Sequence, residues 1–175
     1  MTSSSLESKV NLLSFHKDKI RDSFDIFRET TPEPIYDWTE KKRLLGSNTP
    51  RPGRWNHDVT PYLKEIFDAY NDPECDVIVA MLASQLGKTE FINNCVAHTI
   101  DEDPCPALIV FPIDEMAHKY SKIRLHQMFM DMPQLLENFI NANHSRKSEG
   151  KTLLKVFKKG YLLLSGANSP SNLSS

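Results

Sequence analysis

The chain has 175 residues, of which 39% are hydrophobic, enough to bury the core of one domain with an additional arm. Its formal net charge of −2 gives no overall positive field, so contact with nucleic acid or polyphosphate requires a local patch. Three cysteines without metal-ligand spacing favour a reducing cytosol over a disulfide scaffold. No stretch approaches the roughly 18 apolar residues of a membrane span, and we expect no membrane partner.

An amphipathic helix is expected over about residues 6–28, because apolar residues recur there at alternating spacings of four and three. The pattern is carried by Leu6, Val10, Leu13, Ile20, Phe24 and Phe27. This helix either packs on its own domain or docks a partner. The prolines Pro32 and Pro34 end it. From there to Asn56 the chain is rich in Pro, Gly and charged residues, which predicts an extended connector. We expect residues 1–53 to form this helix and connector.

Alternating strands and helices are expected from residue 60 onward. Thr60-Pro61 is typical of a helix start, and the helix should stop at Asn71-Asp72-Pro73. The continuous apolar run over residues 77–82 predicts a parallel strand covered on both faces. A helix should follow through Ile100, and residues 107–111 predict a second buried strand.

A long helix is expected from about Asp114 to Met130, and a shorter one over about residues 134–141. Residues 152–157 and 161–165 flank Lys158-Lys159-Gly160 and predict a hairpin. The order strand–helix–strand–helix favours an α/β fold with a parallel sheet and right-handed crossovers.

The strongest chemical signal is the segment at residues 83–89, Ala-Ser-Gln-Leu-Gly-Lys-Thr, between the first expected strand and its helix. Gly87 lets the backbone approach a phosphate, and the N–H groups at the helix start point at the anion. Lys88 would neutralise the β- and γ-phosphates, and the Thr89 hydroxyl would bind Mg²⁺. The usual pattern has a glycine five residues before Gly87, where this chain has Leu82. The alternative is an accidental strand-to-helix turn.

Several segments, in order along residues 54–175, resemble the large terminase subunits of lambda-type tailed phages. They are Pro61-Tyr62-Leu63, Ser84-Gln85-Leu86-Gly87-Lys88-Thr89-Glu90, Asn93-Asn94, Val110-Phe111-Pro112, Arg124-Leu125 and Gly166-Ala167-Asn168-Ser169-Pro170. Together these motifs are specific, although Gly-Lys-Thr alone is not. Members of this family have the same altered loop, with no leading glycine and a glutamine near the position of Gln85. We therefore expect residues 54–175 to be part of a P-loop ATPase domain with a parallel sheet and flanking helices.

The resemblance implies a motor that binds ATP with Mg²⁺ and pumps double-stranded phage DNA into a procapsid, in the host bacterial cytoplasm. The full-length family also cuts DNA, and works with a terminase small subunit and the procapsid portal. It implies a nucleotide site at Ser84, Gln85, Leu86, Gly87, Lys88, Thr89 and Glu90, with Lys88 catalytic and Thr89 on Mg²⁺.

Further residues receive roles from the resemblance. Trp55 and Tyr62 precede the loop where related ATPases contact the adenine, so one of them is a candidate for stacking on the base; the alternative is packing in the core or on a helix face. Arg124 is a candidate DNA-phosphate contact, or a solvated arginine on an amphipathic helix. Asn168 and Ser169 form either a polar loop facing DNA or nucleotide, or a tight turn satisfied by its own side chains.

Two parts of the full-length enzyme are not found in the sequence: the acidic pair that follows the Gly-Ala-Asn-Ser-Pro stretch in this family, and the nuclease carboxylates. We therefore expect this chain to bind nucleotide weakly, without turnover or DNA cleavage. Two other functions stay open: a non-catalytic module that docks a partner, and another P-loop DNA-dependent ATPase such as a helicase.

Overall fold

The computed structural model describes residues 31–139 and 150–168. The chain divides into two compact units, residues 1–32 and 33–175, and all elements below belong to the second. The helix expected over residues 6–28 and the candidate contact Ser169 lie outside the described residues. In the described part of the chain, no helix has the length and apolar character needed to cross a membrane.

Among the described residues, the larger of two sheets has three strands in the order β3 (Ala107–Phe111), β5 (Gly160–Gly166), β4 (Leu154–Phe157). β3 pairs with β5 in parallel, and β4 pairs with β5 as an antiparallel hairpin. The turn places Lys159 at φ 67°, ahead of Gly160. The predicted hairpin is therefore confirmed, and the expected parallel pairing is confirmed for β3 and β5: the sheet is mixed, because the hairpin adds an antiparallel strand to the parallel pair.

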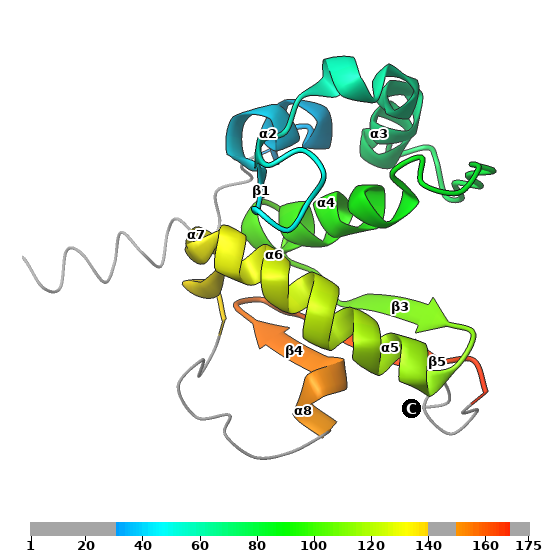
Figure 1. Ribbon diagram of the computed structural model, residues 1–175, viewed down its shortest axis with the longest axis vertical. Coiled ribbons are helices and arrows are strands. Elements are labelled where there is room, and N and C mark those ends of the chain that lie inside the picture. Colours follow the sequence, from blue (N-terminus) through cyan, green and yellow to red (C-terminus); the bar gives the residue numbers. More distant parts are fainter. Residues whose placement is uncertain (1–30, 140–149, 169–175) are drawn as a thin grey trace, which may run out of the picture. The chain divides into compact units, whose positions relative to one another are not determined.

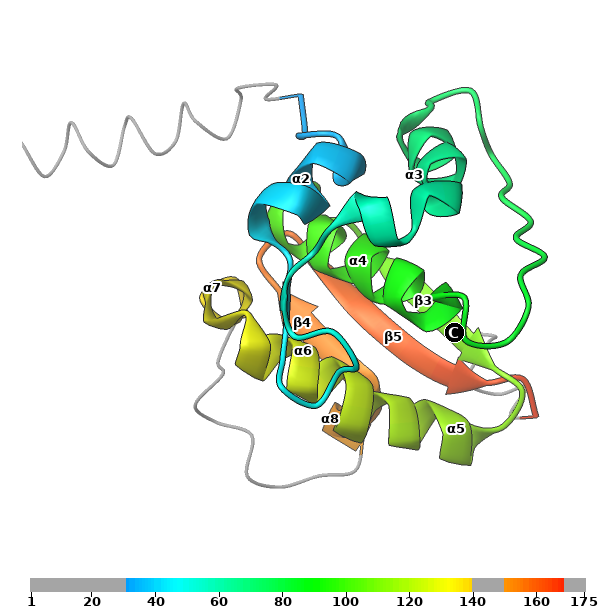
Figure 2. The ribbon, with the colours of Figure 1, turned by 45° about the horizontal axis from the view of Figure 1, so that its top comes forward.

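Helices cover one face of this sheet (Figures 1 and 2). They are α4 (Lys88–Asp101) and one long continuous helix made of α5 (Asp114–Lys119), a π-helical segment η3 (Tyr120–Leu125) and α6 (His126–Asp131), followed by α7 (Pro133–Leu136). The long helix and α4 are confirmed, whereas α7 is shorter than the helix expected around residues 134–141. The central core joins Val96 and Ile100 of α4, Leu125 and Met128 of the long helix, and Leu162 of β5.

The opposite face of the sheet keeps apolar side chains exposed. Leu108 and Val110 of β3 are 53% and 47% exposed, and Val156 and Tyr161 of the hairpin are each 45% exposed. The prediction that residues 107–111 form a strand is confirmed, but the strand is not fully buried: its side chains alternate between half-buried and exposed. The short helix α8 (Gly150–Leu153) leads into β4.

The segment expected to be the first strand pairs with no strand in the described part of the chain. Residues 77–82 have no regular secondary structure, and Val77, Val79 and Met81 are 76%, 82% and 94% exposed. The prediction of a buried parallel strand here is wrong for this structure. An apolar run becomes a strand only where a neighbouring strand accepts its backbone hydrogen bonds, and the described residues supply none beside it.

The expected extended connector contains a helix, α2 (Ile35–Lys42), followed by the two-residue strands β1 (Leu44–Leu45) and β2 (Gly53–Arg54). Two 3₁₀ turns, η1 (His57–Val59) and η2 (Pro61–Leu63), then lead into α3 (Lys64–Asn71). The helix start expected at Thr60-Pro61 is confirmed, with a 3₁₀ first turn in which the Thr60 side chain does not cap. A second core cluster joins Ile35, Trp55, Leu63 and Phe67 from these elements.

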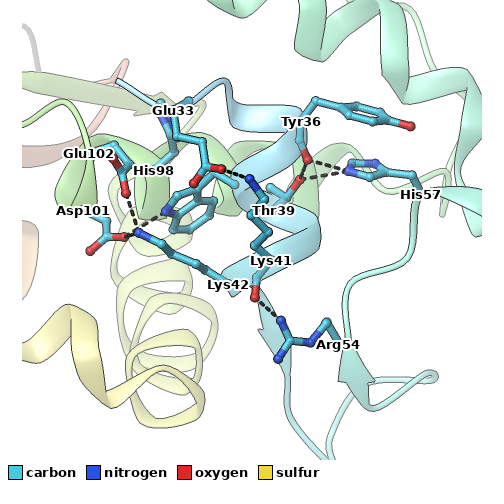
Figure 3. A network of polar contacts seen from close by, with 11 residues as sticks. Glu33, Tyr36, Thr39, Lys41, Lys42, Arg54, His57, His98, Asp101 and Glu102 are labelled. Atoms are coloured by element: carbon cyan, nitrogen blue, oxygen red, sulfur yellow. Dashed lines mark hydrogen bonds and ion pairs between the residues drawn. The ribbon is translucent and has the colours of Figure 1, made fainter. Parts of the chain in front are cut away.

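Hydrogen bonds and ion pairs join α2 to the C-terminal end of α4 (Figure 3). Lys42 Nζ lies 2.9 Å from Asp101 Oδ2 and also contacts the Glu102 carboxylate. Partial burial opposes the charge on Lys42, but hydrogen bonds to Glu102 and Asp101 raise its pKa above the ordinary value. The indole N–H of Trp38 donates to the same Asp101 oxygen at 2.8 Å. These contacts join segments about 60 residues apart in the sequence and hold the connector against α4.

Candidate functional site

The loop before α4 contains two residues with positive φ. Gln85 and Gly87 both adopt left-handed conformations, with φ of 62° and 80°. Glycine takes such a φ without steric cost, whereas a glutamine there is unusual. Gly87 is the N-cap of α4, and no side chain caps this helix start. The first N–H groups of α4 are therefore available to an anion, and the helix dipole favours one there.

Lys88 folds back along the loop. Its ammonium nitrogen donates to the carbonyl oxygen of Leu82 at 2.9 Å, although the residue as a whole is exposed. Leu82 is the position at which the usual loop has glycine. The next residue, Thr89, is also exposed and lies in the first turn of α4. The cation and the hydroxyl thus stand at the start of the same helix.

The 3₁₀ turn η2 lies beside the loop. A Cβ added to Gly87 would lie 3.6 Å from Leu63 Cδ1, which is ordinary contact. The Tyr62 hydroxyl donates to the carbonyl of Leu86 at a long 3.4 Å, and the Tyr62 side chain is 44% exposed. Exposed residues at Ser84, Gln85 and Leu86 complete the surface of the loop.

Trp55 has a different environment. It is only 6% exposed, packs in the second core cluster, and donates its indole N–H to His57 Nδ1 at 3.1 Å. The two aromatic candidates therefore differ in solvent exposure: Trp55 is part of the core, whereas Tyr62 is accessible beside the loop. The burial of Trp55 favours packing, the alternative raised for it from the sequence.

Glu90 is held from two sides. Its Oε2 pairs with Arg43 Nη2 at 3.0 Å, and its Oε1 accepts a hydrogen bond from Asn93 at 3.2 Å. Arg43 is 2% exposed, and burial lowers its pKa from the ordinary value while Glu90 opposes that shift. Sequence reasoning missed Arg43, because Lys41-Lys42-Arg43 looks like a solvated basic run and carries no sign of burial.

Arg124 lies exposed on the π segment η3, at the edge of a pocket of about 140 Å³. π-helical turns are rare and are often found at functional sites. The pocket is lined by α4, the β1 segment and the long helix, including Arg43, Glu90, Asn93, Gln127 and Asp131. Arg124 of η3 and Glu90 of α4 therefore line the same pocket.

Asn168 braces the carboxyl ends of the two parallel strands. Its Oδ1 accepts the backbone N–H of Asp114 at 3.2 Å, and Asp114 Oδ1 accepts the N–H of Gly166 at 2.8 Å. The N–H of Ala167 also donates to the carbonyl of Phe111 at 2.7 Å. The amide oxygen of Asn168 thus joins the end of β5 to the start of α5, 54 residues away in the sequence.

No group of three or more His, Cys, Asp or Glu residues with metal-binding geometry occurs among the described residues.

Comparison with known proteins identifies a family. The family model described as phage terminase large subunit gpA, ATPase domain, matches residues 49–175. This match includes the loop, α4 and the whole sheet. No curated protein and no solved structure matches the chain. The resemblance seen in the sequence is confirmed, and an ATPase domain implies that a nucleotide is used. The chain belongs to the family of the phage terminase large subunit ATPase domain.

Proposed function

We propose that residues 84–90 bind the phosphates of ATP with Mg²⁺, and that this chain is a portion of the ATPase domain with which the full-length family powers the packaging of phage DNA. The observation that carries the proposal is the start of α4. It is uncapped, follows a loop with two left-handed residues, and places Lys88 and Thr89 side by side. Backbone N–H groups, a helix dipole and a cation converge there, which suits a polyphosphate.

Each loop residue has a separate task in this proposal. Gly87 lets the backbone approach the β-phosphate, because a side chain at φ 80° would be strained. Lys88 leaves the Leu82 carbonyl and pairs with the β- and γ-phosphates, exchanging one neutral acceptor for charged ones. Thr89 supplies a hydroxyl to Mg²⁺. Ser84, Gln85, Leu86 and Glu90 shape the loop around the phosphates.

Tyr62 is the better candidate for contact with the adenine. Its ring is partly exposed next to Leu86, whereas Trp55 would have to leave the core to stack on a base. Base stacking on an accessible aromatic ring contributes about 1–3 kcal/mol. We therefore assign the base side of the site to Tyr62.

The domain organisation and the wider partners are part of the proposal. Residues 1–53 form an arm and connector, and residues 54–175 form a P-loop-type domain with α4 and the β3–β5 parallel pair at its centre. Arg124, Asn168 and Ser169 are proposed DNA contacts. The proposed partners are double-stranded phage DNA, the terminase small subunit and the procapsid portal, in the host cytoplasm. The family match supports this packaging context.

Calorimetry with Mg²⁺ and ATP tests the proposal on the 175-residue chain. We expect binding that Lys88→Ala weakens by at least about tenfold, which corresponds to about 1.4 kcal/mol. Lys64→Ala is the control, because Lys64 is also exposed and its ion pair with Asp68 lies on the surface. Absence of binding, or binding that does not depend on Lys88, would contradict the proposal and favour a partner-docking module.

A further inference from the structure

We infer that Arg43 is a positioning residue of the phosphate loop. Through Glu90 it fixes the first turn of α4, and with it the orientation of Lys88 and Thr89 toward phosphate. The inference rests on the proposed function, because it assigns a partner to the loop from outside the loop. Arg43 lies between α2 and β1, 45 residues before Lys88.

The guanidinium of Arg43 donates to four acceptors, three of them oxygens and the fourth the Met132 sulfur at 3.4 Å. Nη2 contacts Glu90 Oε2 at 3.0 Å, Nε donates to Asn94 Oδ1 at 2.8 Å, and Nη1 donates to the Leu44 carbonyl at 2.6 Å. Two of these partners are on α4, one turn apart. A planar guanidinium with several donors holds such a pair in one orientation, which an ammonium does not do.

Glu90 transmits this orientation because it directly follows Thr89. Its second oxygen accepts from Asn93, and Asn93 in turn accepts from the Tyr120 hydroxyl at 2.7 Å. The Glu90 carboxylate is therefore held from the connector on one side and from η3 on the other. A rotation of the first turn of α4 would break both contacts. Lys88 and Thr89 lie on that same turn, so the contacts restrict their movement.

The burial of the Arg43–Glu90 ion pair determines what happens when one partner is removed. The side chains of Arg43 and Glu90 are 3% and 25% exposed. A buried charge that loses its partner is unfavourable, and the surrounding structure adjusts to hydrate it. The adjustment nearest to Glu90 is opening of the first turn of α4. Loss of Arg43 should therefore loosen the loop more than the rest of the fold.

The test compares four variants of the full chain: Arg43→Met, Glu90→Gln, the double variant with both changes, and Arg43→Lys. Affinity for Mg–ATP is measured by calorimetry, stability by urea denaturation, and local order by hydrogen exchange of the amides in residues 83–91. We expect Arg43→Met to weaken Mg–ATP binding by at least about tenfold and to speed exchange in residues 83–91 more than in β5. Arg43→Lys should give an Mg–ATP affinity and an exchange rate of residues 83–91 between those of Arg43→Met and the unmodified chain.

The double variant separates positioning from simple charge compensation. Replacing both partners removes the unpaired charge and should restore most of the urea midpoint. If Arg43 positions the loop, affinity and local exchange stay impaired in the double variant. Restoration of affinity together with stability would overturn the inference, as would equal exchange increases in residues 83–91 and β5. Lys64→Met, which removes an exposed ion pair, is the matched control and should change neither readout.

Failure of the proposed function is distinguishable from failure of this inference. If the unmodified chain binds no nucleotide, the proposed function is contradicted. The hydrogen-exchange comparison then decides the role of Arg43 by itself. If Arg43→Met does not fold, Arg43→Lys and the double variant carry the same comparison.

Discussion

The Lys88 ammonium donates a hydrogen bond to the backbone carbonyl of Leu82, with 2.9 Å between nitrogen and oxygen. The acceptor belongs to the backbone, so the contact does not require a particular side chain at position 82. The Leu82 side chain is half-buried and packs against the cluster of Ile35, Trp55, Leu63 and Phe67. A leucine at the position of the usual glycine is therefore compatible with the lysine contact and adds packing.

Leu82→Gly separates these two contributions. We expect Mg–ATP affinity to stay within about threefold of the unmodified chain. Stability should fall by about 1–3 kcal/mol, because an apolar side chain is lost and glycine has more conformational freedom in the unfolded state. Calorimetry and urea denaturation measure the two effects. A large loss of affinity at unchanged stability would show that the side chain itself shapes the phosphate site.

Tyr62 variants test the base side of the proposed site. Tyr62→Phe should bind Mg–ATP almost as well as the unmodified chain, because the hydroxyl contact with Leu86 is long and the ring is kept. Tyr62→Ala should weaken binding by about 1–3 kcal/mol through the loss of stacking. Val59→Ala is the control, since Val59 is similarly exposed in the neighbouring 3₁₀ turn. Comparable affinity for GTP and ATP in all variants would be consistent with stacking, whereas unchanged binding in Tyr62→Ala would exclude it.

His57→Ala should destabilise the second core cluster. The indole of Trp55 can only donate, so Nδ1 of His57 is the acceptor and Nε2 carries the proton. Nε2 lies 2.8 Å from the carbonyl of Tyr36, and the His57 ring stacks on Tyr36 with centroids 3.7 Å apart. Removing the imidazole leaves a buried indole N–H without an acceptor and opens a cavity.

The expected cost of His57→Ala is about 2–3 kcal/mol in urea denaturation. His126→Ala is the control, because His126 is exposed at the start of α6. Equal, small effects of the two substitutions would mean that the histidine contacts contribute little to the fold.

Alkaline pH should weaken the fold through acids that are partly buried, among them Tyr70 and Cys95. Burial raises the pKa of Tyr70 from 10.0 to about 12 and the pKa of Cys95 from 9.0 to about 12. Both groups are neutral when protonated, and their folded pKa values exceed the unfolded ones. Their contribution to stability is therefore fully present below about pH 9 and is lost as the pH rises toward 12.

Tyr70→Phe tests the tyrosine part of this effect. The urea midpoint of this variant should fall less steeply above pH 10 than that of the unmodified chain. At neutral pH the variant loses only the hydrogen bond between the Tyr70 and Thr99 hydroxyl groups, which measures 2.9 Å. Parallel curves for the two proteins across pH 9 to about 11 would contradict the assignment to Tyr70.

Gly166→Ala should disturb the carboxyl ends of the parallel strands. A Cβ at position 166 would lie 2.4 Å from the backbone nitrogen of Asp114, so the backbone of one strand end has to move. We expect a loss of about 1–3 kcal/mol in thermal or urea denaturation. Ala167→Ser, at the exposed neighbouring position, is the control. Full stability of Gly166→Ala would mean that the loops after β3 and β5 separate without cost.

Elements whose signals are local could be predicted from the sequence alone. The run of residues 107–111, the pattern of α4 and the hairpin around Gly160 each combine apolar periodicity with a turn or helix-start residue. The phosphate-loop hypothesis came from Gly-Lys-Thr between an expected strand and an expected helix; the helix is confirmed, whereas residues 77–82 form no strand in this structure. Helix α2 was missed although Pro34 precedes it and Lys41 and Lys42 lie in its last turn, a usual sign of a helix end.

Strand pairing, core packing and long-range ion pairs depend on tertiary contacts that the local sequence does not reveal. Residues 77–82 have the composition of a buried strand, yet a strand depends on a neighbour that composition does not reveal. Trp55 and Tyr62 are both aromatic residues upstream of the loop, and packing alone placed one in the core and left the other accessible. Arg43 and Glu90 are 47 residues apart in the sequence. They pair because folding removes most of both side chains from water, and a charge withdrawn from water is stabilised by an opposite charge.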